Sequence, residues 1–386
     1  MKTTIACGLA LSLVIGCGTS TTKETPTIAD PAPIVYPAAR RSDQVDDYHG
    51  TKVADPYRWL EDPDSPESRA WIEAENKLTF GFLEQIPQRE PIRKRLTQLW
   101  NYERYGIPTK RGGRYVYSRN DGLQNQSVLY TVTSLDGEPQ VLLDPNKLSP
   151  DGTIALTGYE LSDDGKFLAY GLADAGSDWQ TWHVRDVETG KEGDVVHWVK
   201  FSGASWSHSG DGYYYSRYDA PAEGAALTET NYYQKVYFHH LGVPQLGDKL
   251  VYERPDQKEW GFQAHVTDDG HYLILGVTRG TDPNNQLFYL DLNDPGAKVV
   301  ELITGFDADY GFIGNDGSTF WLRTDLDAPR YRVIAIDVNK PERDAWREVI
   351  PQVDDLLEDI RDVGGRFFAS YLHDAHSRVE MFETGG

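Results

Sequence analysis

Apolar residues near the start of the chain recur at helical spacing, and the spacing then changes to the alternation typical of strands. Ser65 followed by Pro66 predicts a helix start, because a serine side chain can cap free backbone N–H groups and proline fits the first helical position. The apolar residues of this first helix are Trp71, Leu78 and Phe82. A second helix is predicted over residues 91–100, with Ile92, Leu96 and Leu99 on one face.

Beyond these helices, one pattern of a turn, a glycine and an alternating strand repeats six times. The repeats begin at Gly113, Gly165, Gly212, Gly270, Gly317 and Gly365, which lie 52, 47, 58, 47 and 48 residues apart. In most repeats a second pair of strands follows, as in the segment LYTV at residues 129–132 before the turn LDG. A period near fifty residues with about four short strands per unit is typical of propeller blades.

Other all-β architectures fit this repeat less well. A β-sandwich does not repeat one strand and turn pattern six times at nearly constant period, and a parallel β-helix has much shorter coils. We therefore predict a mainly β fold, a propeller of the seven-bladed type with about six blades present, preceded by an N-terminal helical arm. The last unit is expected to be incomplete, with two strands, since it stops at residues 382–386.

The composition agrees with a folded globule and argues against nucleic acid as a partner. Hydrophobic residues make up 39% of the chain and aromatic residues 12%, which is enough for a sizeable core. The 60 acidic and 38 basic residues leave a formal charge of −22, and such a surface repels phosphate backbones.

The N-terminus has the features of an export signal. Lys2 precedes an apolar stretch at residues 5–15 that is too short to span a bilayer. This stretch ends in Val-Ile-Gly-Cys17, which resembles the lipobox of bacterial lipoproteins, and an ordinary signal peptide is the alternative. The resemblance implies lipidation of Cys17, a periplasmic location and anchoring to the membrane. Residues 1–17 are thus predicted to be a lipoprotein-type signal peptide and residues 18–35 a tether.

Cysteine and metal chemistry are not expected in the folded part. Cys7 and Cys17 are the two cysteines of the chain, so the remainder has no thiol for a disulfide or a cysteine nucleophile. The histidine pairs His239/His240 and His373/His376 lack a convincing third metal ligand. We predict no metal site and no cofactor.

Hydrolytic chemistry within these 386 residues is not expected either. A serine hydrolase of the α/β class needs Gly-x-Ser-x-Gly, and the nearest segment, around Ser205, lacks the second glycine and lies in a β pattern. We interpret Ser205 as structural. Two acidic pairs immediately precede repeat glycines and are interpreted as turn residues rather than glycosidase carboxylates: Asp163-Asp164 and Asp268-Asp269.

Residues 48–63 read YHGTKVADPYRWLEDP, which resembles the opening of prolyl oligopeptidases closely. The resemblance continues through the segments GLQNQSVLY at 122–130, GSDW at 176–179, VKFS at 199–202, TDP at 281–283 and YLHD at 371–374. It implies a serine peptidase that cleaves short peptides after proline, with a propeller over an α/β-hydrolase domain acting as a filter on substrate size. It also implies that the catalytic serine, aspartate and histidine lie beyond the propeller, so no catalytic residue is expected here.

The resemblance divides the chain and suggests where it meets substrate. Residues 36–101 would form the helical arm, which in the family is part of the hydrolase domain, and residues 102–386 a truncated propeller. The family's propeller positions that line the far subsites of the peptide match Phe201, Gly261 and Thr281. Phe201 keeps the aromatic ring, Gly261 and Thr281 are smaller than the side chains of many relatives, and a plain core role for Phe201 is the alternative.

Three accounts of the whole protein follow. The first is the N-terminal and propeller part of an exported, lipid-anchored prolyl oligopeptidase, inactive as this chain alone, whose partners are short proline-containing peptides, the hydrolase domain and the membrane. The second is a non-enzymatic, lipid-anchored propeller that serves as a binding module. The third is a split enzyme whose chains reassemble. A blade that ends unfinished favours the first, because an open ring leaves strand edges exposed.

Overall fold

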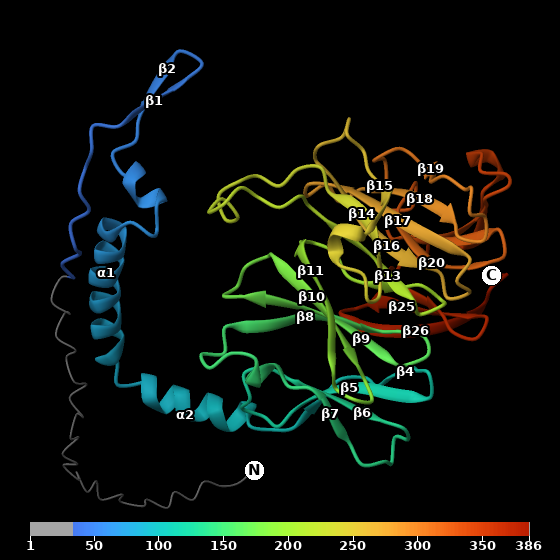
Figure 1. Cartoon of the computed structure of the whole chain (residues 1–386), viewed down its shortest axis with the longest axis horizontal. Helices are drawn as coiled ribbons and strands as arrows, with labels where there is room; N and C mark the ends of the chain where they lie inside the picture. The colour runs from blue at the N-terminus through green and yellow to red at the C-terminus, as the bar shows by residue number, and fades with distance from the viewer. Residues whose placement is uncertain (1–33, 386) are drawn as a thin grey trace, which may run out of the picture. The chain divides into compact units, whose positions relative to one another are not determined.

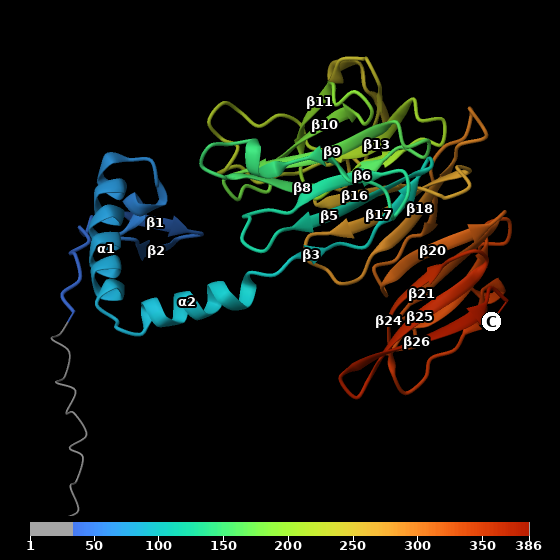
Figure 2. The ribbon, with the colours of Figure 1, turned by 90° about the horizontal axis from the view of Figure 1, so that it is seen from below.

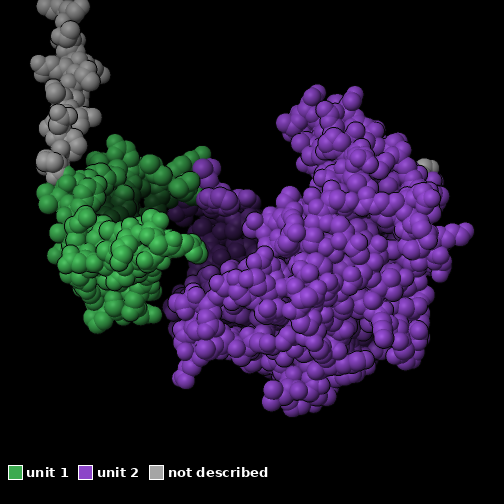
Figure 3. Space-filling view, turned by 90° about the horizontal axis from the view of Figure 1, so that it is seen from above, with its two compact units in different colours: residues 1–96 green, residues 97–386 purple. Residues whose placement is uncertain are grey.

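The computed structural model describes residues 34–385 and divides the chain into two compact units, residues 1–96 and 97–386 (Figure 3). The predicted signal peptide, and the predicted tether except for its last two residues, lie outside the described part. Within residues 34–385, no helix has both the length and the apolar character needed to cross a bilayer.

The first unit contains a short hairpin and the predicted helices. Its elements are β1 (Val45–Tyr48), β2 (Thr51–Ala54), α1 (Pro66–Glu84) and the first part of α2 (Arg89–Trp100), which crosses the boundary between the units. Ser65 is extended and its hydroxyl accepts a hydrogen bond of 3.2 Å from the Ser68 amide, so the predicted helix start is confirmed. The second helix ends at Trp100 as predicted but begins two residues earlier, at Arg89.

The helices bury very little. Ser68 is the single buried residue of α1, and α2 contains no buried residue. Phe82, Leu96 and Leu99 are 45%, 49% and 51% exposed, while Trp71 and Leu78 are half-buried. The apolar faces that the periodicity predicts therefore exist, but they are largely open to solvent.

The second unit is built of antiparallel strands that follow one another in chain order (Figure 1). The first two strand groups are β3 (Arg104–Tyr105), β4 (Thr109–Arg111), β5 (Arg114–Asn120), β6 (Val128–Val132), β7 (Gln140–Leu143), then β8 (Ile154–Leu161), β9 (Phe167–Asp174), β10 (Gln180–Asp186) and β11 (Glu192–Val199). The third and fourth groups are β12 (Ser205–Trp206), β13 (Gly212–Arg217), β14 (Lys235–His240), β15 (Lys249–Tyr252), then β16 (Trp260–Val266), β17 (Tyr272–Arg279), β18 (Gln286–Asp291) and β19 (Val300–Ile303). The last two groups are β20 (Tyr310–Asp316), β21 (Thr319–Thr324), β22 (Arg332–Asp337), β23 (Arg347–Ile350), then β24 (Leu356–Asp362), β25 (Arg366–His373) and β26 (His376–Glu383).

Each group is a meander, and the core lies between successive groups. The second and third groups form one continuous sheet through a single pairing of Val199 with Arg217. Buried side chains of the fourth group pack on those of the fifth, including Tyr272 against Phe320, whose ring centroids lie 4.9 Å apart. Trp321 of the fifth group packs in the same way on Phe367 of the sixth. Figure 2 shows these two groups, coloured orange and red, beside each other. This face-to-face packing of repeated sheets confirms the mainly β, propeller-type fold class, while the number of blades stays a prediction.

Five of the six repeat glycines lie in a turn between two consecutive strands of a group. Gly113, Gly165, Gly270 and Gly317 all have positive φ, which glycine adopts at little cost. Gly365 also has a positive φ and lies between β24 and β25. The last group contains three strands, β24, β25 and β26. The expectation of two strands was wrong because the pattern of glycine followed by a strand misses the strand before the turn.

Gly212 is an exception among these glycines. It lies at the start of β13, and a Cβ there would overlap the carbonyl oxygen of His239 on the neighbouring strand β14. Close approach of two backbones, rather than a positive φ, explains this glycine.

Candidate functional site

A cavity of about 660 Å³ in the second unit brings together all three residues that the sequence singled out for substrate contact. Phe201 follows the end of β11, Gly261 lies in β16, and Thr281 follows β17. They are up to 80 residues apart in the sequence. They share one cavity because the second and third strand groups form one sheet and the third group packs on the fourth. The cavity gathers them but does not by itself test their role.

Phe201 lies at an unusual point of the backbone. Its side chain is 59% exposed and its φ is +55°, and Trp198 three residues earlier has a φ of +62°. Such left-handed conformations are costly for residues with a Cβ and persist only where the surroundings hold them. The ring of Phe201 is therefore presented outward by a constrained turn, and the plain core reading does not fit its exposure.

Lys200 anchors this turn from the side. Its ammonium group donates a hydrogen bond of 3.0 Å to the Asn231 side-chain oxygen and lies 5.3 Å from the centre of the Phe201 ring. It also lies 5.1 Å from the ring centre of Trp179, so one cation contacts two aromatic rings.

Gly261 keeps the cavity open on the side of β16. A Cβ at this position would lie 2.9 Å from the Thr278 hydroxyl on β17 and 3.4 Å from the Gln234 side-chain oxygen. A larger residue would therefore fill space that the cavity now offers. Beside Thr281, the Arg279 guanidinium donates a 2.5 Å hydrogen bond to Asp282 and holds the pKa of that carboxyl below its ordinary value.

Sequence reasoning missed the residues that line the cavity from the segment between β13 and β14. They are Tyr218, Thr230, Asn231, Tyr232 and Gln234. Burial raises the pKa of the Tyr218 phenol above its ordinary value. The run Asn-Tyr-Tyr-Gln directly before β14 was the available signal, but it belongs to no periodic pattern.

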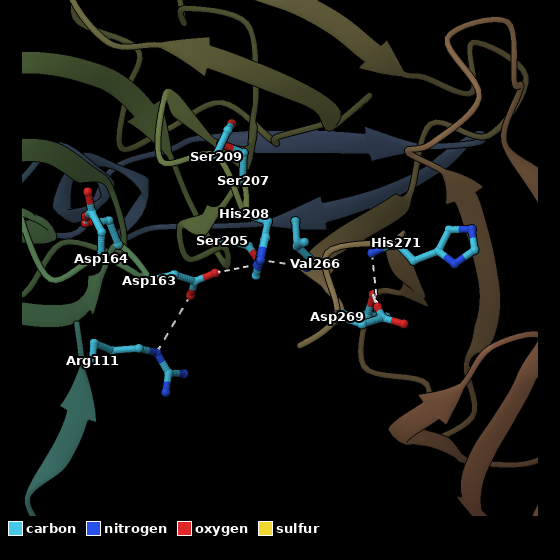
Figure 4. Close-up of polar contacts among 12 residues, drawn as sticks. Arg111, Asp163, Asp164, Ser205, Ser207, His208, Ser209, Val266, Asp269 and His271 are labelled. Atoms are coloured by element: carbon cyan, nitrogen blue, oxygen red, sulfur yellow. Dashed lines mark hydrogen bonds and ion pairs between the residues drawn. The ribbon is translucent and has the colours of Figure 1, made fainter. Parts of the chain in front are cut away.

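A second cavity of about 320 Å³ contains the serine that most nearly matched a nucleophile motif (Figure 4). The Ser205 hydroxyl accepts a hydrogen bond of 2.8 Å from the backbone amide of Val266, which ties β12 to β16. His208 is nearby, but its ring nitrogen pairs with Asp163 at 2.9 Å. Ser205 thus has a structural hydrogen bond, as its sequence context indicated.

Both acidic pairs lie in turns between strands. Asp164 accepts a hydrogen bond from the Lys166 amide and Asp269 from the His271 amide, each at 3.0 Å, so the second member of each pair is a turn residue as predicted. The first members, Asp163 and Asp268, lie in the same turns as predicted and also line the second cavity. Glu160 lines it too, and burial raises the pKa of its carboxyl.

The histidines considered as metal ligands face carboxylates. The His239 Nδ1 atom lies 2.7 Å from Asp248 and Nε2 lies 3.5 Å from Asp194, with the histidine side chain fully buried. The His373 Nδ1 atom lies 2.9 Å from Asp355. Among residues 34–385, no three histidine, cysteine or acidic side chains gather in a way that could hold a metal ion.

Comparison with known proteins identifies the family to which this architecture belongs. Residues 36–386 match the family model for the prolyl oligopeptidase N-terminal β-propeller domain. The chain belongs to the prolyl oligopeptidase family. A prolyl endopeptidase from Elizabethkingia meningoseptica is 39% identical over 352 residues, which cover 91% of this chain and 49% of that protein. Prolyl oligopeptidase A from Galerina marginata is 32% identical and is covered over 53% of its length.

Comparison with solved structures leads to the same family as comparison of sequences. Prolyl oligopeptidase B from Galerina marginata, bound to a 35mer hydrolysis and macrocyclization substrate, superimposes with a TM-score of 0.82 at 30% identity and covers 92% of this chain. The match covers 53% of that structure, and the chain spans about half the length of the curated relatives it matches. The chain thus corresponds to the N-terminal propeller domain of this family, and the comparisons do not support the alternative of a non-enzymatic binding module.

Proposed function

We propose that this chain serves a peptidase that cleaves short peptides after proline, in which an α/β-hydrolase domain supplies the chemistry and the propeller limits substrate size. The match to the propeller domain of prolyl oligopeptidases over residues 36–386 carries this proposal. The predicted position of the helical arm, packed on that hydrolase domain, is consistent with the exposed apolar residues of α1 and α2.

The cavity around Phe201 is proposed to contact peptide residues away from the scissile bond. Its walls combine aromatic rings with amide and hydroxyl groups, a mixture that suits the alternating apolar and polar groups of a peptide. Phe201 presents the largest exposed apolar surface among the three predicted contacts, so its ring is expected to provide most of the hydrophobic contribution.

Replacing Phe201 by alanine tests this contact. Binding of a Gly-Pro peptide with an N-terminal aromatic blocking group, measured by isothermal titration calorimetry on this chain, is expected to weaken about tenfold, or about 1.4 kcal/mol. Folding should be unaffected because the ring is mostly exposed and alanine carries the same Cβ at the left-handed position. The same chain is expected to leave the peptide uncleaved, because it contains no Gly-x-Ser-x-Gly segment.

Phe80→Ala is the matched control, because Phe80 is similarly exposed, at 53%, and lies in α1. Equal affinity in the Phe201→Ala and Phe80→Ala variants would contradict the assigned contact. Absence of peptide binding by the unaltered chain would contradict the role of the propeller cavity itself.

We further propose that the protein is exported to the periplasm and anchored to the membrane through a lipid on Cys17. The support is the lipobox-like Val-Ile-Gly-Cys17 after a short apolar stretch. Expression in a bacterial host should yield a mature N-terminus at Cys17 that carries acyl chains by mass spectrometry. Cys17→Ala should move the protein from the detergent phase to the aqueous phase, and an unchanged partition would count against the anchor.

A further inference from the structure

Gln234 joins the two sides of the 660 Å³ cavity through its buried side chain. It lies directly before β14 and is 2% exposed. Its amide nitrogen donates a hydrogen bond of 2.8 Å to the carbonyl oxygen of Lys200, and its amide oxygen accepts one of 2.5 Å from the backbone N–H of Phe262.

Both partners are backbone neighbours of the residues that the sequence assigned to substrate contact. The Lys200 carbonyl belongs to the peptide bond that leads into Phe201, and the Phe262 amide belongs to the peptide bond that follows Gly261. One side chain therefore spans from the turn after β11 to the strand β16. Because these are main-chain contacts, moving Gln234 would move Phe201 and Gly261 relative to each other.

Glutamine has particular properties that suit this position. The bridge needs one donor and one acceptor at the end of a side chain of this length, and both must be buried without net charge. Glutamate in its ionised form offers acceptors only, and methionine offers no donor and only a weak sulfur acceptor. The turn that Gln234 holds contains Phe201 and Trp198 in left-handed conformations, which require support from the surroundings.

We propose that Gln234 is a positioning residue that sets the separation between Phe201 and Gly261 and thereby decides which peptide side chains the cavity accepts. This inference rests on the proposed function, since it concerns the peptide that the cavity would hold. It does not make Gln234 a catalytic residue.

Substitution by glutamate separates this role from general packing. Burial raises the pKa of a carboxyl group, so the acid at position 234 is protonated below that raised pKa and ionised above it. The protonated acid again has one donor and one acceptor, which restores the bridge, while the ionised form places its charge against the Lys200 carbonyl. The bridge is thus present at low pH and lost as the pH rises through that pKa.

Other ionisable groups face this region and are common to all variants. They are Tyr218, Tyr232, Glu259 and Asp282 around the cavity, Lys200 beside it, and Asp219, Tyr233, Lys235, Glu253 and Arg254 on the other side of Gln234. Their titration appears in the unaltered chain, whose pH profile is subtracted. Gln140→Glu, at an exposed glutamine that opens β7, controls for the substitution itself.

The experiment measures binding of the blocked Gly-Pro peptide to the unaltered chain, Gln234→Glu, Gln234→Met and Gln140→Glu at pH 5 and pH 8. Both variants at position 234 are expected to bind about tenfold more weakly at pH 8. Gln234→Glu should return to within about twofold of the unaltered chain at pH 5, and Gln234→Met should not. Circular dichroism at both pH values establishes that each variant is folded.

A second readout needs no peptide. With 4-fluorophenylalanine at position 201, the fluorine resonance is expected to shift in Gln234→Met at both pH values and to return in Gln234→Glu at pH 5. If the unaltered chain binds no peptide, the proposed function fails while this signal still reports on positioning. A fluorine resonance that is the same in all folded variants, or a loss in Gln234→Glu that low pH does not reverse, would overturn the proposal.

Discussion

Amide hydrogen exchange in α1 and α2 is expected to be at least about a thousandfold faster than in the central strands of the second unit. The helices bury almost nothing, and helices in proteins owe most of their stability to tertiary packing of an apolar face. Strands such as β9, β17 and β21 contain fully buried leucines, among them Leu168, Leu273 and Leu322. Their amides should exchange only when much of the sheet opens.

The measurement is exchange followed by mass spectrometry, with the oligomeric state of the same sample determined by light scattering. The last strand, β26, should be intermediate, because it pairs with β25 on one side and its Val379 and Met381 are more than half exposed. Equal protection of α1, α2 and β17 in a monomer would show that the exposed helical faces are stable without a further partner. That outcome would weaken the proposal that these helices pack on a hydrolase domain.

Replacing Asp248 by alanine is expected to lower the free energy of unfolding of the propeller by about 3–5 kcal/mol. The Asp248 side chain is fully buried and pairs with His239 Nδ1 at 2.7 Å. Its second oxygen accepts a hydrogen bond of 2.6 Å from the Tyr215 hydroxyl. Burial, together with this hydrogen bond, raises the pKa of that tyrosine well above its ordinary value. Alanine would leave the imidazole and the phenol without their partner inside the third strand group.

Urea unfolding monitored by exchange in β13 and β14 measures this loss. Asp256→Ala is the matched control, because Asp256 also pairs with a basic group, Arg254, but lies on the surface, where ion pairs contribute little. Asp248→Asn should fall between the two, since it keeps an oxygen acceptor for the tyrosine and loses the charge. Similar urea midpoints for Asp248→Ala and Asp256→Ala would show that the buried pair is not important for stability.

Local features of this protein follow from the sequence because they depend on neighbours in the chain. The start of α1 is determined by Ser65, Pro66 and the amide three residues after the cap, all within one helical turn. The strand repeats follow from the alternation of apolar residues and from glycines such as Gly165, whose positive φ permits a tight turn. Ser205, Asp164 and Asp269 were assigned structural roles from their surroundings alone, and their hydrogen bonds agree.

The sequence was less informative where a feature needs two segments to meet. It marked Phe201, Gly261 and Thr281 through resemblance to a family. Their common cavity exists only because the third strand group, which shares a sheet with β11, packs on β16 and β17 of the fourth group. The repeat pattern did not predict β24, the first strand of the last group, because β24 lies before the glycine that marks the repeat.

The partners of the buried polar side chains could not be identified from the sequence. Gln234 reaches Lys200 and Phe262 across 34 and 28 residues, and His239 meets Asp194 across 45 and Asp248 across nine. The sequence does not distinguish a solvated polar residue from a buried one, because burial depends on which other segment covers the residue. The period of the hydrophobic residues and the turn residues therefore determined the strands and helices of this protein. Only the tertiary arrangement of these strands, within a group and between groups, decided which polar side chains became buried bridges.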